Sequence, residues 1–172
     1  MYEGPLRNAV HGLKYKRNIG LAESLSTHLV EIYKTMGWKI DLVVPVPLSN
    51  RRRLERGYNQ ANLLAYPMAL TCQLPYSNHA MNRVRETRSQ VGLTTGERQL
   101  NVKDAFTADP TIVRGKSVLV IDDVATTGAT QQACANALMV AGASTVYGLT
   151  LARAVFHNET AGETQTSDHP IF

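Results

Sequence analysis

The segment from Ser117 to Arg153 constrains the fold of this chain most strongly. It begins with SVLVID, an apolar run rich in β-branched residues that is typical of a buried parallel strand. An alanine-rich helix is predicted over residues 130–141, because Gly142 then offers a stop. STVYGLTLAR, at residues 144–153, has the pattern of a second strand. This order predicts an α/β fold with a mostly parallel central sheet flanked by helices.

The chain before this segment is predicted to supply further helices and another strand. The spacing of Leu21, Leu25, Leu29 and Ile32, four and three residues apart, indicates a helix up to Gly37. DLVVPVP, at residues 41–47, predicts a short buried strand with prolines at its end. A helix is expected over about residues 59–72, and Pro67 should kink or end it.

Composition limits the class of protein. The 172 residues are 44% hydrophobic, enough for one globular domain with a real core, which we place at residues 1–155 before a polar tail at 156–172. The net charge of +4 suits an anionic ligand such as a phosphate ester, and does not by itself indicate nucleic acid. The sequence shows no leader pattern, no metal-type cysteine spacing and no apolar run long enough to span a bilayer, so a cytoplasmic protein is expected.

The residues that join the predicted strand at 117–122 to the helix form a candidate phosphate site. Ligands of open α/β sheets bind at the carboxyl ends of the strands. Small residues there let the backbone approach a ligand, and the N–H groups that open a helix favour an anion. The residues concerned are Ala125, Thr126, Thr127, Gly128, Ala129 and Thr130.

Asp122 and Asp123 stand just before this phosphate cradle. Carboxylates repel a phosphate, so they should face the vicinal hydroxyls of a ribose, or a magnesium ion bound to them. A ribose 5-phosphate satisfies both parts of the site. The alternative is that Asp123 caps the helix and Asp122 is a solvated residue at the strand end.

Two arginine-rich segments are candidates for binding further phosphate groups. Arginine forks match phosphate oxygens, and the loop predicted after the strand at 41–47 contains four arginines, Arg51, Arg52, Arg53 and Arg56. A solvated basic face or a patch for nucleic acid is the alternative there. Arg83, Arg85 and Arg88 precede a segment rich in Gly, Thr and Gln, which suits either a closing lid or an ordinary polar loop.

Three stretches resemble known families. VLVIDDVATTGAT, at 118–130, is similar to the phosphoribosyl pyrophosphate (PRPP) signature of type I phosphoribosyltransferases. Residues 43–65, which include RGYNQA, and residues 83–106 resemble the ComF/GntX family of phosphoribosyltransferase-like proteins. The resemblance covers roughly residues 4–155. ComF-like proteins usually carry a cysteine-rich zinc module before this part; the chain begins at that boundary, so no zinc site is expected.

The resemblance implies a role for each segment. Asp122 and Asp123 would bind the ribose hydroxyls and take part in catalysis, with magnesium held through PRPP near them rather than by the protein alone. Residues 125–130 would hold the 5-phosphate. The pyrophosphate-binding residues would be Leu48, Ser49, Asn50, Arg51 and Arg52, and the mobile loop that covers the ligand would include Arg83, Arg85, Arg88 and Gln90.

The implied activity is transfer of phosphoribose from PRPP to an acceptor that the sequence does not identify. Thr126 stands where several enzymes that use purine bases carry an acid, so purine salvage is not expected and no general base can be named. Two alternatives stay open. One is a PRPP- or nucleotide-binding protein without catalysis. The other is an accessory protein for DNA uptake or use, acting through protein partners or single-stranded DNA. The basic N-terminal helices could also pair two subunits.

Overall fold

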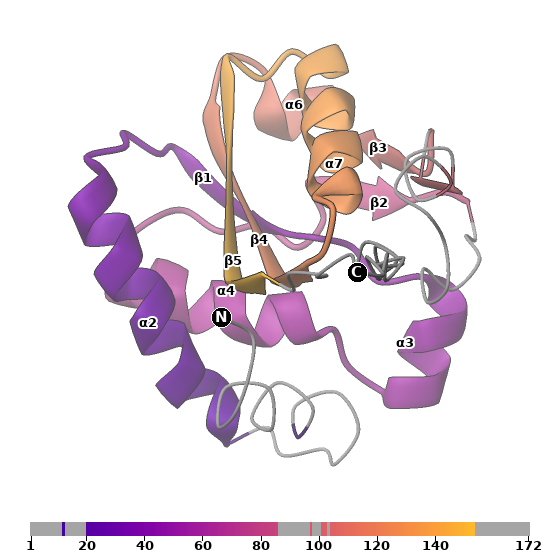
Figure 1. The fold of residues 1–172 in the computed structure, drawn as a ribbon. Coiled ribbons are helices and arrows are strands. Elements are labelled where there is room, and N and C mark those ends of the chain that lie inside the picture. The colour runs from indigo at the N-terminus through magenta and orange to yellow at the C-terminus, as the bar shows by residue number, and fades with distance from the viewer. Residues whose placement is uncertain (1–11, 13–19, 86–96, 98–100, 103, 154–172) are drawn as a thin grey trace, which may run out of the picture.

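The computed structural model describes residues 12, 20–85, 97, 101–102 and 104–153, which form a three-layer α/β arrangement (Figure 1). The elements named in Figure 1 are α2 (Leu21–Met36), β1 (Leu42–Pro45), α3 (Asn50–Arg56), α4 (Gln60–Thr71), β2 (Met81–Arg83), β3 (Phe106–Ala108), α6 (Pro110–Val113), β4 (Ser117–Ala125), α7 (Ala129–Val140) and β5 (Thr145–Arg153). None of the described helices has the length and apolar character needed to cross a membrane.

The central sheet is parallel and has the order β1-β4-β5. Val43 pairs with Leu119, and Ile121 pairs with Leu149, so β4 has a neighbour on both sides over residues 118–121. Helix α7 connects β4 to β5, as the strand–helix–strand pattern predicted. The predicted α/β class with a mostly parallel sheet is therefore confirmed.

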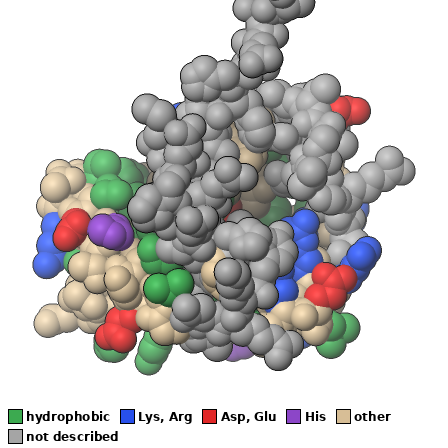
Figure 2. Space-filling view, turned by 60° about the horizontal axis from the view of Figure 1, so that its bottom comes forward, with side chains coloured by type: hydrophobic (Ala, Val, Ile, Leu, Met, Phe, Trp, Pro, Cys, Tyr) green, Lys and Arg blue, Asp and Glu red, His purple; other side chains and the backbone are tan. Residues whose placement is uncertain are grey.

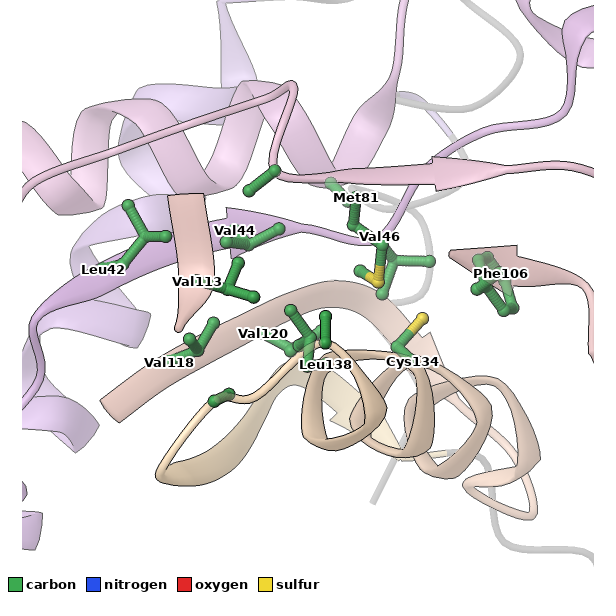
Figure 3. Close-up of a cluster of buried hydrophobic side chains, with 14 of the residues drawn as sticks. Leu42, Val44, Val46, Met81, Phe106, Val113, Val118, Val120, Cys134 and Leu138 are labelled. Atoms are coloured by element: carbon green, nitrogen blue, oxygen red, sulfur yellow. The ribbon is translucent and has the colours of Figure 1, made fainter. Parts of the chain in front are cut away.

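One face of the sheet packs against α7. Val44, Val118 and Val120 point to this side, where Leu138 and Cys134 project from the helix (Figure 3). Leu138 and Cys134 are both 0% exposed. The sheet thus anchors α7 through a dry interface, which fixes the turn that precedes the helix.

The opposite face of the sheet packs against α2 and α4. Residues of odd number point this way, since side chains alternate along a strand. Val43, Leu119 and Ile121 belong to this cluster together with Leu29 of α2 and Leu64 of α4. A strand covered on both faces must be apolar throughout, which explains the unbroken run VLVI in β4.

Helix α4 continues past Pro67, so the expectation that this proline could end the helix is wrong. A proline inside a helix removes one backbone hydrogen bond and costs about 3 kcal/mol. Leu64 and Met68, on either side of Pro67 in the chain, are both 0% exposed. Their burial against the sheet keeps the helix intact as far as Thr71.

Two features were missed in the sequence. Residues 50–56 form helix α3, where a loop was expected, and β2 pairs with β3 in a separate antiparallel sheet. Each of these two strands has three residues, too few for a periodic pattern. Helix α3 buries none of its residues and so lacks the apolar stripe that signals a helix. The predicted tail at 156–172 lies outside the described residues.

Candidate functional site

The ends of β1 and β4 meet at the same edge of the sheet. The backbone N–H of Val46, just after β1, donates to the carbonyl of Ile121 at 2.9 Å. Because the two strands are parallel, the segments that follow them both leave at the carboxyl edge. This is the edge at which α/β sheets of this kind bind ligands. The predicted phosphate cradle and the predicted pyrophosphate segment are therefore neighbours.

Asp122 and Asp123 lie inside β4, which continues to Ala125, three residues beyond the predicted end. Burial raises the pKa of Cys134, a residue of α7, and the charge of the Asp122 carboxylate raises it further. Asp123 is 8% exposed, whereas Asp122 is half-buried.

Local backbone hydrogen bonds orient both carboxylates. The N–H of Asp123 donates to Oδ1 of Asp122 at 2.9 Å, and the N–H of Val124 donates to Oδ1 of Asp123 at 2.8 Å. Asp123 does not cap α7, because the N-cap residue of that helix is Gly128. The alternative in which Asp123 serves only as a helix cap is therefore wrong.

The turn into α7 is built around Gly128. Its φ of 80° is left-handed, a region that L side chains rarely adopt, and it brings no side chain to cap the helix. Oγ1 of Thr127 accepts a hydrogen bond from the N–H of Ala129 at 3.4 Å. The predicted cradle residues 125–130 thus form one strand-to-helix turn, with α7 starting at Ala129 rather than Thr130.

A cavity of about 430 Å³ borders this turn. Thr127 and Gly128 line one side, and Tyr147 and Gly148 of β5 line the other. The amide of Gln131 lies against Gly148, where an added Cβ would approach its nitrogen to 3.1 Å. An added Cβ at position 148 would therefore require the Gln131 side chain to shift by a few tenths of an ångström.

The predicted pyrophosphate residues, Leu48 to Arg52, lead into α3 rather than forming an open loop. Ser49 is the N-cap, and its Oγ accepts a hydrogen bond from the N–H of Arg52 at 3.3 Å. Ser49 is 4% exposed, so its side chain acts as a structural cap in this arrangement. Asn50 and Arg51 belong to the first turn of the helix and are exposed.

The arginines of α3 present a basic surface beside the edge of the sheet. In Figure 2, Lys and Arg side chains gather on the right of the view, where Figure 1 places α3, and acidic side chains lie beside them. Nε of Arg51 donates to Oε1 of Glu55 at 2.8 Å in a largely exposed pair. Such a surface can bind phosphate groups without rearranging a buried core.

The segment between α3 and α4 is tied to the strand end. Gly57 ends α3 with a φ of 83°. Asn59 caps α4: its side chain accepts a hydrogen bond from the N–H of Ala61 at 3.1 Å. Its Nδ2 also donates to the carbonyl of Val46 at 3.0 Å, which the sequence did not predict. The RGYNQA motif therefore joins the arginine-rich helix to the carboxyl edge.

Arg83 belongs to β2, so it is not part of a loop as predicted. Its guanidinium lies 5.4 Å from the ring centroid of Phe106. Burial raises the pKa of Cys134 far above its usual value, the Asp122 carboxylate raises it further, and the Arg83 guanidinium lowers it. The charges of Arg83 and Asp122, which belong to different strands, therefore act on the same thiol in opposite directions.

The rest of the predicted lid is described only in part. Nη2 of Arg85 donates to the carbonyl of Asn101 at 3.1 Å, which joins the two ends of the segment. Arg88 and Gln90 lie outside the described residues. Among the residues that are described, no three His, Cys, Asp or Glu side chains gather as a metal site.

Comparison with known proteins agrees with this geometry. Residues 14–170 match the family model described as "Phosphoribosyl transferase domain". The chain is 35% identical over 150 residues to the DNA utilization protein YhgH of Shigella flexneri, covering 84% of this chain and 66% of that protein. It is 30% identical over 160 residues to competence protein F of Haemophilus influenzae, covering 89% of this chain and 70% of that protein.

Among solved structures, the glutamine PRPP amidotransferase from B. subtilis complexed with ADP and GMP superimposes with a TM-score of 0.52. The two are 20% identical over 76% of this chain and 26% of the other, which supports a shared fold. The chain spans 66% of the length of the YhgH proteins it matches. With a family match over residues 14–170 and a ComF-type relative matched over most of its length, this chain belongs to the phosphoribosyltransferase domain family, in its ComF branch, and has the type I phosphoribosyltransferase fold.

Proposed function

We propose that this protein binds PRPP at the carboxyl edge of the sheet and transfers its phosphoribosyl group to an acceptor. The observation that carries the proposal is the pair Asp122 and Asp123, held by backbone N–H groups directly before the Gly128 turn into α7. Carboxylates suit ribose hydroxyls, and the helix start suits the 5-phosphate. The ribose hydroxyls and the 5-phosphate would then both be bound by residues at the junction of β4 and α7.

The pyrophosphate group would lie toward α3. The end of β1 adjoins β4 through Val46 and Ile121, so a ligand anchored at residues 125–130 can extend toward residues 48–52. Arg51 is exposed and Arg52 half-exposed there, and guanidinium groups bind phosphate oxygens in pairs. Arg83, on β2, is a further cation whose charge acts on Cys134 of α7.

Magnesium fits this site as an ion shared with the ligand. Two adjacent carboxylates offer the oxygen atoms that magnesium prefers, and phosphate and hydroxyl oxygens of PRPP would complete its coordination. Asp122 and Asp123 are the residues that would hold it, directly or through the ribose hydroxyls. When bound, it would neutralise charge on the departing pyrophosphate.

The reaction is displacement at the anomeric carbon of the ribose. The bond to pyrophosphate breaks as the acceptor bonds to carbon, while positive charge develops on the sugar. Asp122 and Asp123 would fix the ring and stabilise that charge, and the arginines would stabilise the leaving group. Thr126 offers a hydroxyl where a general base would need a carboxylate, so a purine base is not the expected acceptor.

Calorimetric titration of PRPP with magnesium tests the proposal. We expect micromolar binding by the wild type, and affinity about a hundredfold lower in Asp122→Asn/Asp123→Asn, since two charge-assisted contacts are weakened. Thermal unfolding of the double variant checks that it folds. Acceptors are then screened by pyrophosphate release. Absence of PRPP binding by the folded wild type would refute the proposed site.

A second candidate function is handling of single-stranded DNA during uptake or use. The names of the relatives, DNA utilization protein and competence protein, favour it, as do the exposed arginines Arg51 and Arg53. Binding of labelled oligonucleotides should then weaken steeply with salt, because phosphate contacts release counterions. The two free cysteines, Cys72 and Cys134, suit a reducing compartment, so a cytoplasmic location is part of this proposal.

A further inference from the structure

Gln60 is a buried polar residue that the site described so far does not use. It is the first residue of α4 and is 2% exposed. Its Oε1 accepts a hydrogen bond from Nη1 of Arg56 at 2.9 Å. Its Nε2 is shielded from solvent and finds no acceptor in the part of the chain that the structure describes. A buried donor without a partner costs about 1–3 kcal/mol.

The orientation of this amide is set by chemistry. A guanidinium has only donors, so the atom of Gln60 that faces Arg56 must be the oxygen. Turning the amide over would place its NH2 group against the Arg56 guanidinium, so that two donors would face each other. The other atom of the amide would still have no partner. The atom without a partner is therefore the nitrogen, and Arg56 holds it in place.

The amide also lies at the ligand-binding edge. Asn59, the preceding residue, donates to the carbonyl of Val46, whose own N–H is bonded to the carbonyl of Ile121. Ile121 directly precedes Asp122. Gln60 is thus fixed beside the ends of β1 and β4, on the side of the arginine-rich helix.

Helix α3, which carries Arg56, has little packing to hold it in place. Arg56 is the last residue of α3, and this helix buries none of its residues. Gly57, which follows it, has an exposed left-handed backbone with nothing within 4 Å of where a Cβ would stand. Displacing α3 therefore disturbs little packing, unlike displacing α7.

We propose that Gln60 is a ligand-binding residue whose Nε2 donates to an oxygen of the pyrophosphate group, with Arg56 orienting the amide. This inference rests on the proposed function, because it assigns a contact within the same site. A phosphate oxygen supplies the acceptor that Nε2 lacks, and Arg56 supplies positive charge beside it. In this role Gln60 contributes to affinity for pyrophosphate and does not contribute to affinity for the ribose 5-phosphate part of the ligand.

Two substitutions test this role by calorimetry with magnesium pyrophosphate and, separately, with ribose 5-phosphate. Gln60→Met keeps the volume and removes the amide; Gln60→Glu keeps an acceptor for Arg56 and removes the donor. Each should weaken pyrophosphate binding about tenfold or more, the effect of one hydrogen bond to a charged group. Ribose 5-phosphate binding should stay within about twofold.

Gln131→Met is the matched control, since Gln131 carries the other buried amide nitrogen without a partner among the described residues. It should leave pyrophosphate affinity unchanged. Unchanged pyrophosphate affinity in both Gln60 variants, or equal weakening of both ligands, would overturn the inference. Failure of the wild type to bind pyrophosphate while it binds ribose 5-phosphate would overturn it as well, but would leave the acidic site standing. Failure of the wild type to bind either ligand would refute the proposed function itself.

Discussion

The segments that follow β4 and β1 leave the same edge of the sheet but are held there in different ways. Helix α7, after β4, has twelve residues and buries Cys134 and Leu138 against the sheet. Helix α3, after β1, has seven residues and buries none. The acidic half of the site, Asp122 and Asp123, therefore adjoins a firmly packed helix. The basic half, formed by the arginines of α3, lies on a helix that packing does not hold in place. A rigid half suits a defined sugar phosphate, and a loosely packed half suits a leaving group that must depart.

A pair of leucine substitutions gives the sharpest test of this difference. Leu138→Ala should lower the free energy of unfolding by about 2–5 kcal/mol, because it opens a cavity beneath α7. Leu54→Ala, at a residue of α3 that is 87% exposed, should change it by about 0.5 kcal/mol or less. Denaturant unfolding measures both. Similar values for the two variants would show that α3 is as firmly packed as α7.

The glycines that adjoin the two helices offer a smaller and more specific test. Gly128 and Gly57 have φ values of 80° and 83°, and an added Cβ would touch nothing within 4 Å at either position. Alanine at each should therefore cost about 1–2 kcal/mol of stability through backbone strain alone. Thermal unfolding should give nearly equal losses.

The ligand effects of the same two substitutions should differ. Gly128→Ala distorts the turn before α7 and should weaken ribose 5-phosphate binding about tenfold. Gly57→Ala lies outside that turn and should leave ribose 5-phosphate binding unchanged. Equal weakening by both variants would mean that the 5-phosphate is not bound at the start of α7. Calorimetry with ribose 5-phosphate alone separates these outcomes.

The same contrast explains what the sequence could predict. Strand β4 and helix α7 were predicted closely. Burial on both faces requires an apolar run in β4, and the alanine-rich segment after it continues without a break as far as Gly142. Helix α3 was taken for a loop, because a helix without a buried face leaves no periodic pattern. Pro67 indicated the end of α4, yet the burial of Leu64 and Met68 outweighs its local effect.

The sequence could indicate only those candidate site residues whose residue type by itself implies their chemistry. Two acids before a small-residue turn indicate Asp122 and Asp123 as candidate ligand-binding residues from the sequence alone. Gln60 gave no such signal, since a glutamine at a helix start is ordinary. Its importance depends on burial and on the bond from Arg56, which arise from the tertiary arrangement. Arg83 was placed in a loop for the same reason, as a three-residue strand has no pattern of its own.

The smallest expected effect concerns the exposed pair between Arg51 and Glu55. The two side chains are 79% and 53% exposed, so Glu55→Gln should change stability by about 0.5 kcal/mol or less. Its effect on binding should exceed its effect on stability. Glu55 competes with phosphate oxygens for the guanidinium of Arg51, and its charge repels an anion. Pyrophosphate affinity should therefore rise about two- to threefold at low salt and less at high salt, where exposed charges are screened.

Glu31→Gln provides the control, because Glu31 is an exposed acid on α2 that lies 3.6 Å from His28. It removes the same charge from a helix that packs on the opposite side of the sheet from α7. If both substitutions raise pyrophosphate affinity equally, the effect reflects net charge, and α3 has no special part in binding. If only Glu55→Gln raises it, Arg51 contacts the pyrophosphate, and the loosely packed half of the site binds the leaving group.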